Sequence, residues 1–317
     1  MSFAISHQIE NELEQVVLLD EETKTSVVVL PACGAMLHAF NIQTKGNSFN
    51  MVDNYKSMDE FSNTVYGSHK SSKLSPFVCR IKEGKYKFDN NEFEFANKFQ
   101  DGSAIHGLLV KKQFKVIKEE ATDTSASVVM KYGYHKDDAA YPFDYSCEVK
   151  YQLKKDNLLT VETTVTNTGK QAIPIADGWH PYFTLKGKTD DWELCFCAKQ
   201  MLEFDEKLIP TGRLIPNEKF SNPEKIGGTF LDNCFLLDEL NGAAACSLRN
   251  PANGLELLFF AEQQYPYLQI YTPPHRNTIA IENLSAAPDC FNNKMGLIIL
   301  EPQQSQTFTV SYQMVVR

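Results

Sequence analysis

The fold is decided by the stretch Tyr145-Ser146-Cys147-Glu148-Val149-Lys150-Tyr151-Gln152-Leu153. Its apolar and polar side chains alternate, which is the period of a strand with one buried face and one face in water. A polar run, Lys154-Lys155-Asp156-Asn157, supplies turn residues, and the same alternation resumes from Leu159 to Val165. The pattern predicts a long antiparallel hairpin.

Other parts of the chain show the same preference for strands. Residues 308, 310, 312, 314 and 316 form an apolar face near the C-terminus, and the apolar runs 27–30, 255–260 and 297–300 indicate buried strands. No helical period extends over eleven or more residues, so we expect only short helices, for example around 288–291 with Ser285 as cap. An all-β fold follows, a large antiparallel β-sandwich. No repeat or linker marks a boundary, so residues 1–317 are expected to form one domain.

Composition narrows the classes of partner. The formal charge is −9 and no segment gathers Lys and Arg, which argues against nucleic acid as a partner. The N-terminus has no apolar signal region and no run reaches membrane-spanning length, so we expect a cytoplasmic protein without a membrane partner. In that setting the eight cysteines are expected to be reduced thiols, and Cys195 and Cys197 lack the further ligands that zinc requires.

Three polar clusters interrupt the apolar pattern, at residues 104–107, 178–183 and 279–283. A single histidine beside glycine, such as His106, is more often structural than catalytic, and the aromatic residues around His180 could line a sugar pocket or simply fill the core. Strand alternation places Glu282 on the face opposite Ile279 and Ile281. A dry concave face would raise the pKa of Glu282 and a solvated rim would not, and the sequence leaves both open.

The order of these residues resembles that of the aldose 1-epimerase, or galactose mutarotase, family. The similarity begins near residues 29–35, passes through 74–81 and reaches 288–292, so it covers nearly the whole chain. The resemblance implies a galactose mutarotase-like supersandwich whose strands curve into a sugar-binding groove. The positions that carry it are Arg80, His106, His180, Asp232 and Glu282.

The resemblance also implies roles. Glu282 matches the general base, His180 the general acid and His106 a second histidine near the reacting centre. Arg80 and Asp232 match positions that bind sugar hydroxyls. Trp179 stands where many galactose-active members carry Asn, and Leu108-Leu109 stands where they carry a glycine-rich extension. We therefore expect Trp179 to contact the substrate and to affect which sugar is accepted.

The expected activity is that of an isomerase that interconverts the α and β anomers of an aldose. Ring opening removes a proton from the anomeric hydroxyl and delivers one to the ring oxygen, so a base and an acid are both required. A glutamate with a pKa of about 4.3 is ionised and a histidine with a pKa of about 6.5 can be protonated near neutrality. We expect no cofactor and no metal, a small sugar as partner, and a monomer or homodimer.

Other readings stay open. A hexose-phosphate mutarotase is one, because Lys70, Lys73 and Arg80 could together meet a phosphate. A non-catalytic carbohydrate-binding or sensor protein on the same fold is another. A glycoside hydrolase would use Glu282 with Asp232 as a carboxylate pair, although two histidines do not belong to that chemistry. A metal-dependent β-barrel enzyme would need a His-x-His pattern with a carboxylate, which the sequence lacks.

Overall fold

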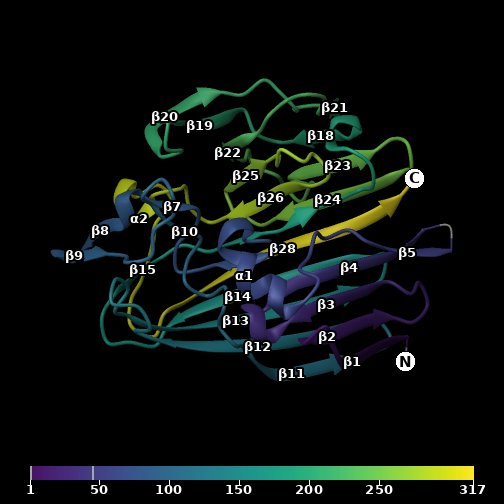
Figure 1. Cartoon of the computed structure of the whole chain (residues 1–317), viewed down its shortest axis with the longest axis horizontal. Coiled ribbons are helices and arrows are strands. Elements are labelled where there is room, and N and C mark those ends of the chain that lie inside the picture. Colours follow the sequence, from purple (N-terminus) through teal and green to yellow (C-terminus); the bar gives the residue numbers. More distant parts are fainter. Residues whose placement is uncertain (1, 45) are drawn as a thin grey trace.

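The hairpin is the centre of the fold in the computed structural model, which describes residues 2–44 and 46–317 (Figure 1). Strand β13 (Asp144–Lys154) pairs with β14 (Leu158–Asn167) from Tyr145 opposite Asn167 to Lys154 opposite Leu158. In the turn, Asp156 and Asn157 have φ of 63° and 54°. Asp and Asn tolerate this left-handed conformation better than most residues, so the turn chemistry fits the geometry. The predicted hairpin is confirmed.

A nine-stranded antiparallel sheet is built around this hairpin. The alternating residues 145, 147, 149, 151 and 153 of β13 are all fully buried on its inner face. Strand β28 (Ser305–Val316) lies between β14 and β24, and its predicted apolar face is buried except at the end, where Val316 is 52% exposed. The other strands of this sheet are β11 (Lys115–Ala121), β12 (Ser125–His135), β24 (Leu255–Ala261), β23 (Cys246–Asn250), β18 (Glu193–Phe196) and β21 (Glu224–Lys225).

An eight-stranded sheet packs against the first. The ring of Phe183 lies 5.2 Å from that of Phe259 and 5.4 Å from that of Tyr312, which belong to the nine-stranded sheet. One face of the eight-stranded sheet is therefore core, and the opposite face can hold polar groups. In order its strands are β20 (Pro210–Pro216), β19 (Gln200–Phe204), β22 (Asp232–Leu236), β25 (Tyr267–Tyr271), β26 (Ile279–Leu284), β16 (Gly178–His180) and β6 (Ser72–Leu74), with β17 (Tyr182–Phe183) also paired to β26.

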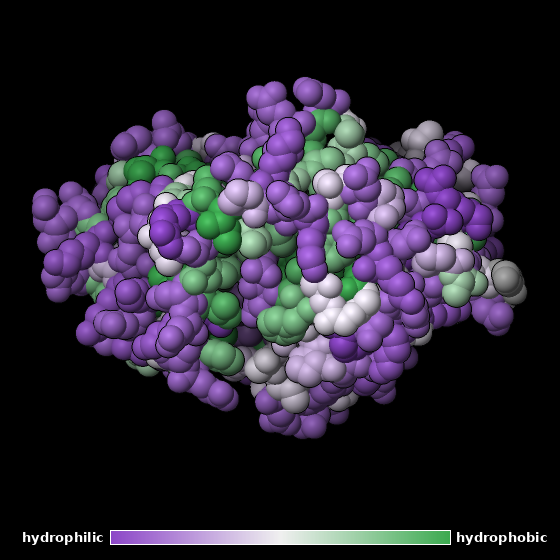
Figure 2. All heavy atoms as spheres, turned by 90° about the horizontal axis from the view of Figure 1, so that it is seen from above, coloured by the Kyte–Doolittle hydropathy of each residue, from purple (hydrophilic) through white to green (hydrophobic). Residues whose placement is uncertain are grey.

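A five-stranded sheet and three small ladders complete the described strands. The main hydrophobic cluster draws buried side chains from all three large sheets. On the face seen in Figure 2, hydrophobic side chains gather toward the middle and hydrophilic ones surround them. The five-stranded sheet consists of β1 (Phe3–Glu10), β2 (Leu13–Asp20), β3 (Ser26–Leu30), β4 (Met36–Thr44) and β5 (Asn47–Asn50), and the ladders are β7 (Arg80–Ile81) with β10 (Ala104–Ile105), β8 (Lys85–Phe88) with β9 (Asn91–Glu94), and β15 (Ile173–Ile175) with β27 (Ile298–Leu300).

The helices correct two sequence predictions. Helix α1 (Met58–Ser68) has 11 residues, although no helix of that length was expected. Its N-terminus is capped by Ser57, whose Oγ accepts a hydrogen bond from the Glu60 N–H at 3.1 Å. Helix α2 (Cys290–Asn293) is where a short helix was predicted, but Asp289 precedes it, and Ser285 Oγ instead accepts from the Asp177 N–H at 2.8 Å. Three 3₁₀ turns are η1 (Pro31–Cys33), η2 (Lys82–Gly84) and η3 (Thr189–Asp191).

Three smaller expectations can be compared with the structure. The run 297–300 is not a buried strand throughout, because β27 pairs with a single neighbour and leaves Ile299 42% exposed. The eight cysteines are free, as expected for reduced thiols. Among the described residues, no helix is long and apolar enough to cross a membrane.

An ion pair is buried where three strands of the eight-stranded sheet meet. Lys73 Nζ lies 2.6 Å from Asp177 Oδ1, and both side chains are fully buried. The ammonium also donates to the Gly178 carbonyl at 3.0 Å, while Asp177 accepts from the Tyr265 hydroxyl at 2.7 Å. Burial raises the pKa of Asp177, and the Lys73 charge opposes that rise. The pair ties β6 to the residue that precedes β16.

Removing one partner of this pair should be costly. We expect Lys73→Met to lower the free energy of unfolding by about 3–5 kcal/mol, because it leaves a carboxylate uncompensated in the core. Urea denaturation measures the change. The matched control is Lys87→Met, which removes a lysine from a pair with Glu92 whose side chains are 78% and 74% exposed, and its midpoint should not move. Equal effects in the two variants would contradict the assignment.

Candidate active site

The candidate site lies on the face of the eight-stranded sheet that is turned away from the core. Consecutive side chains of a strand point to opposite faces. On β16, Trp179 faces the core and His180 faces the site. On β26, Asn283 lies near the core residue Tyr312, whose hydroxyl is 3.5 Å from its Oδ1, so Glu282 faces the other way. The predicted sharing of a face by Glu282 and Ala280 agrees with this arrangement.

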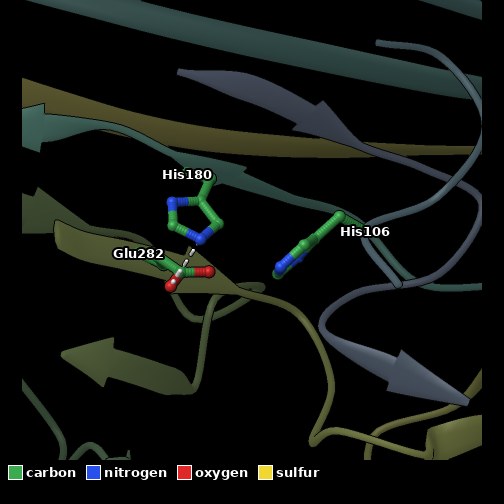
Figure 3. Close-up of side chains that lie close together, drawn as sticks. All are labelled: His106, His180 and Glu282. Atoms are coloured by element: carbon green, nitrogen blue, oxygen red, sulfur yellow. Dashed lines mark ion pairs between the residues drawn. The ribbon is translucent and has the colours of Figure 1, made fainter. Parts of the chain in front are cut away.

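His180 and Glu282 meet because β16 pairs with β26, and the register that sets Gly178 opposite Leu284 and Tyr182 opposite Ala280 places His180 opposite Glu282. A Cβ on Gly178 would lie 2.9 Å from the Asn283 carbonyl oxygen and 2.8 Å from Leu284 Cδ2, so only glycine fits there. The two strands bring His180 Nε2 to 3.3 Å from Glu282 Oε1. Figure 3 shows the imidazole and the carboxylate pointing toward each other.

His106 reaches the same place from a tight loop after β10. It has φ of 59° and is followed by Gly107 with φ of 73°. A Cβ on Gly107 would lie 2.4 Å from the Ser75 carbonyl oxygen, so this position also requires glycine. The His106 ring centroid lies 4.8 Å from that of His180, nearly perpendicular to it, and Figure 3 shows it approaching the pair.

A third histidine, His69, was missed by the sequence analysis. It is the C-terminal cap of α1, is 5% exposed, and its ring centroid lies 4.6 Å from that of His106. Burial lowers its pKa to about 4, against a raising effect of the Tyr66 backbone. The Ser57-x-x-Glu60 capping pattern could have revealed the helix, but no local signal places its end beside His106.

Burial changes the protonation expected for the central pair. It lowers the pKa of His180 to about 3, with a further contribution from His69. It raises the pKa of Glu282 well above the usual value, an effect that Asp232 increases and Arg80 opposes. The direction of both shifts is opposite to the expected pairing of a protonated histidine with an ionised glutamate. Loss of water favours the uncharged forms, with one proton on the carboxyl group.

Arg80 and Asp232 border the pair. Arg80 Nε donates to Asp101 Oδ2 at 2.9 Å, and its side chain is 20% exposed. Asp232 begins β22, and its Oδ1 accepts from Gln269 Nε2 at 2.9 Å. The positive charge of Arg80 opposes the effect of burial on both Asp232 and Glu282, so it lies within electrostatic reach of both carboxyl groups.

Gln269 is a second residue that the sequence analysis missed. It pairs with Glu282 across β25 and β26, is 6% exposed, and its Oε1 has no hydrogen-bond partner in the protein. The sequence does indicate Gln269, because it is the single amide in the otherwise aliphatic and aromatic run Tyr267-Leu268-Gln269-Ile270-Tyr271. A buried polar side chain in such a strand needs a hydrogen-bond partner, which makes Gln269 a candidate site residue.

Aromatic side chains border the site on the next row of the sheet. Across neighbouring strands, Asp232 pairs with Tyr271, Tyr271 with Ala280, and Ala280 with Tyr182, so the four side chains share one face. The two tyrosine rings lie 6.5 Å apart, nearly perpendicular, and the ring of Tyr182 stacks on His180 at 5.1 Å and 17°. Aromatic faces beside hydroxyl-binding groups suit a sugar ring.

Trp179 does not contribute to this site. It is 4% exposed, its Nε1 donates to Thr163 Oγ1 at 3.3 Å, and its ring lies 4.5 Å from Lys73 Nζ. The expectation that Trp179 contacts the substrate is therefore corrected. The physical reason is strand alternation, which sends the neighbour of a site residue into the core.

Several buried polar atoms at the site have no hydrogen-bond partner in the protein. They include Nδ1 of His106 and His180, both ring nitrogens of His69, Oε1 of Gln269 and Oε2 of Glu282. Such atoms are costly unless a ligand or water satisfies them. Ligand atoms of His106, His180 and Glu282 lie within 4.8 Å of one another, so these three residues could also surround a metal ion. The expectation of no metal remains a prediction.

A cavity of about 660 Å³ adjoins the site on the side of His69. Its lining includes Tyr66, His69, Ile105 and Leu108, but neither His180 nor Glu282. The residues on either side of His106, Ile105 and Gly107, thus line this cavity together with His69.

Comparison with known proteins identifies the family. The family model for aldose 1-epimerase matches residues 15–313. The chain belongs to the aldose 1-epimerase family. Among curated proteins, the uncharacterized protein YihR of Escherichia coli K12 is 27% identical to this aldose 1-epimerase family member over 241 residues, which are 74% of this chain and 75% of YihR.

Solved structures confirm the fold of this aldose 1-epimerase family member. A galactose mutarotase-like protein from Clostridium acetobutylicum has a TM-score of 0.88 and 18% identity, with 100% of this chain and 99% of that chain covered. A galactose 1-epimerase from Lactobacillus acidophilus NCFM has a TM-score of 0.81 and 19% identity, with 99% and 98% covered. The predicted large antiparallel mutarotase-like β-sandwich is confirmed.

His69 gives a prediction for stability as a function of pH. The pKa of His69 is about 4 in the folded protein, whereas an unburied histidine, as in the unfolded chain, has a pKa of 6.5. Between pH 4 and pH 6.5 the unfolded chain therefore binds one more proton than the folded protein. Stability therefore rises with pH in this window and falls as pH drops from 6.5 to 4. We expect His69→Gln to reduce the slope of unfolding free energy against pH by up to about 1.4 kcal/mol per pH unit.

Denaturation at several pH values between 4.5 and 6.5 measures this slope. His135→Gln removes an exposed histidine, whose side chain is 74% accessible, and serves as the matched control. A slope in His69→Gln equal to that of the unsubstituted protein would show that His69 is not buried in its neutral form.

Proposed function

We propose that this protein is a mutarotase that interconverts the α and β anomers of an aldose by acid/base-catalysed ring opening and closure. The observation that carries the proposal is the buried contact of 3.3 Å between His180 Nε2 and Glu282 Oε1. The pair offers a proton donor and a proton acceptor a few ångströms apart, as transfer at the ring oxygen and the anomeric hydroxyl requires. Membership of the aldose 1-epimerase family supports an isomerase acting on carbohydrates.

One proton moving between the two side chains is enough for the reaction. Burial favours the uncharged forms of both side chains. Transfer of that proton from Glu282 to His180 creates a carboxylate and an imidazolium without any change in net charge. The carboxylate then takes the proton of the anomeric hydroxyl while His180 protonates the ring oxygen and the C1–O5 bond breaks. Rotation about C1–C2 and the reverse transfers close the ring as the other anomer.

The other polar residues bind and orient the sugar in this proposal. His106, Arg80 and Asp232 border the pair and can donate to or accept from sugar hydroxyls. Gln269 donates to Asp232 at 2.9 Å, and its buried Oε1 is free to accept a hydrogen bond from a sugar hydroxyl. Tyr182 and Tyr271 offer aromatic surface to the C–H groups of the pyranose. No group outside the protein is needed for these steps.

A sugar phosphate is a weaker candidate than a neutral sugar. Lys73 is fully buried against Asp177 and cannot reach a ligand on the site face. Lys70 Nζ lies 3.1 Å from Asp53 Oδ1, and Arg80 is paired with Asp101. Each of the three cations that could have bound a phosphate is therefore already paired with a different aspartate.

A non-catalytic sugar-binding protein would retain the pocket without needing the acid/base pair. The close approach of His180 and Glu282 supports catalysis, because a buried carboxyl group that only binds hydroxyls gains nothing from a costly buried imidazole partner. The rate of anomer exchange distinguishes the two functions.

The catalytic proposal predicts a large loss on Glu282→Gln. Each positioned acid or base is worth about 10²- to 10⁴-fold in rate, so the variant should lose about that factor in kcat. NMR exchange between anomers, over a panel of aldoses and their 6-phosphates, measures the rate. Circular dichroism checks that the fold is intact.

Glu162→Gln on β14 is the matched control, because it removes a carboxylate outside the site, and it should turn over at the unsubstituted rate. Anomer exchange by Glu282→Gln at the unsubstituted rate would exclude Glu282 as the base. Absence of acceleration by the unsubstituted protein for every sugar tested would favour the binding protein.

A further inference from the structure

An exposed aromatic residue stands at the edge of the site. Phe230 is 64% exposed and lies two residues before Asp232, in the segment that joins β21 to β22. A single exposed apolar side chain is common on a protein surface and does not by itself mark a site. What distinguishes Phe230 is the ordered segment that carries it and its contact with the aromatic row of the site.

The segment that carries Phe230 is fixed on both sides. Arg276 donates from Nη1 to the Thr229 carbonyl at 3.1 Å and from Nη2 to the Gly227 carbonyl, while its Nε pairs with Asp190. Leu231 donates its N–H to Thr272 Oγ1 at 2.9 Å and accepts the Thr272 N–H at 2.9 Å. The ring is therefore displayed on an ordered support, and a ligand that packs on it pays little for ordering the loop.

Phe230 also continues the aromatic row of the site. Its ring centroid lies 6.3 Å from that of Tyr271, nearly perpendicular to it. Tyr271 contacts Tyr182 at 6.5 Å, and Tyr182 stacks on His180 at 5.1 Å. The row thus leads from the catalytic imidazole past Asp232 to the surface. The row therefore offers aromatic surface beyond the ring that stacks on His180, at Tyr271 and at Phe230.

We propose that Phe230 forms a second sugar subsite, so that the preferred substrate is an aldose carrying a further glycosyl unit rather than a free monosaccharide. This inference rests on the proposed mutarotase function. The reducing unit, whose anomeric hydroxyl must be free, lies at His180 and Glu282. The second unit extends past Tyr271 and places the apolar face of its pyranose ring on Phe230.

The test compares reducing disaccharides with their monosaccharides. Anomer exchange of maltose, cellobiose and lactose is measured beside that of glucose and galactose, by NMR, for the unsubstituted protein and Phe230→Ala. We expect at least one disaccharide to have a lower KM than either monosaccharide, and Phe230→Ala to raise that KM by about 3- to 10-fold. Values for monosaccharides should stay unchanged, because Phe230 lies outside the catalytic pair.

Two further variants separate stacking from loss of an apolar side chain. Phe230→Trp should retain the preference for the disaccharide, because an indole offers a similar face. Ile9→Ala removes another exposed apolar residue, 72% accessible on β1, and should change nothing. Equal KM values for disaccharides in the unsubstituted protein and Phe230→Ala would overturn the subsite, as would a change only in the sedimentation coefficient, which would make Phe230 a protein contact.

Failure of the mutarotase proposal gives a different result. If the protein accelerates no anomer exchange, calorimetric binding of the same disaccharides decides the subsite. Weaker binding to Phe230→Ala than to the unsubstituted protein would support it, and equal or absent binding would reject it.

Discussion

The close approach of β16 to β26 at Gly178 is the constraint on which the site depends. Glycine at this position lets one backbone lie against the other, and the contact sets the separation of His180 and Glu282. The buried pair of Lys73 and Asp177 holds the same junction from the core side. A larger residue at 178 would move the imidazole away from the carboxyl group while leaving both residues in the chain. The geometry of the candidate site is thus set by backbone packing as much as by the two side chains.

The removal of water around that contact determines its chemistry. Burial favours the neutral forms of His180 and Glu282, because neither charged form is well solvated within the sheet. The positive charge of Arg80 partly offsets the rise in the pKa of Glu282. The neighbouring histidines instead add to the effect of burial, because His69 and His180 both lower the pKa of His106. A sugar bound among these groups would supply hydroxyls to the unpartnered nitrogens and oxygens. Such a ligand would make the charged form of the pair easier to reach.

Local pattern predicted the strands well and the site only in part. Residues 145–153 and 159–165 alternate between apolar and polar because each strand has one buried face. That pattern was enough to predict the hairpin and the sandwich. Alternation also placed Glu282 opposite Ile281, but could not say whether its face was dry. His69 and Gln269 join the site through contacts between distant segments, which no local period reports. The resemblance could not place Trp179, because a motif gives the order of residues and not the face of the strand, and His180 occupies the site face at that point.

The alternation of β16 has a further consequence for substitutions on its two faces. Trp179 and His180 are adjacent in sequence, yet one belongs to the sandwich interior and the other to the candidate site. The same separation holds along β26, where Ile281 and Glu282 face opposite ways. Substitutions on the site face of these strands can therefore leave the interior packing intact, and substitutions in the interior can leave the site face intact. Stability and the chemistry of the candidate site are thus carried by separate sets of side chains on the same strands.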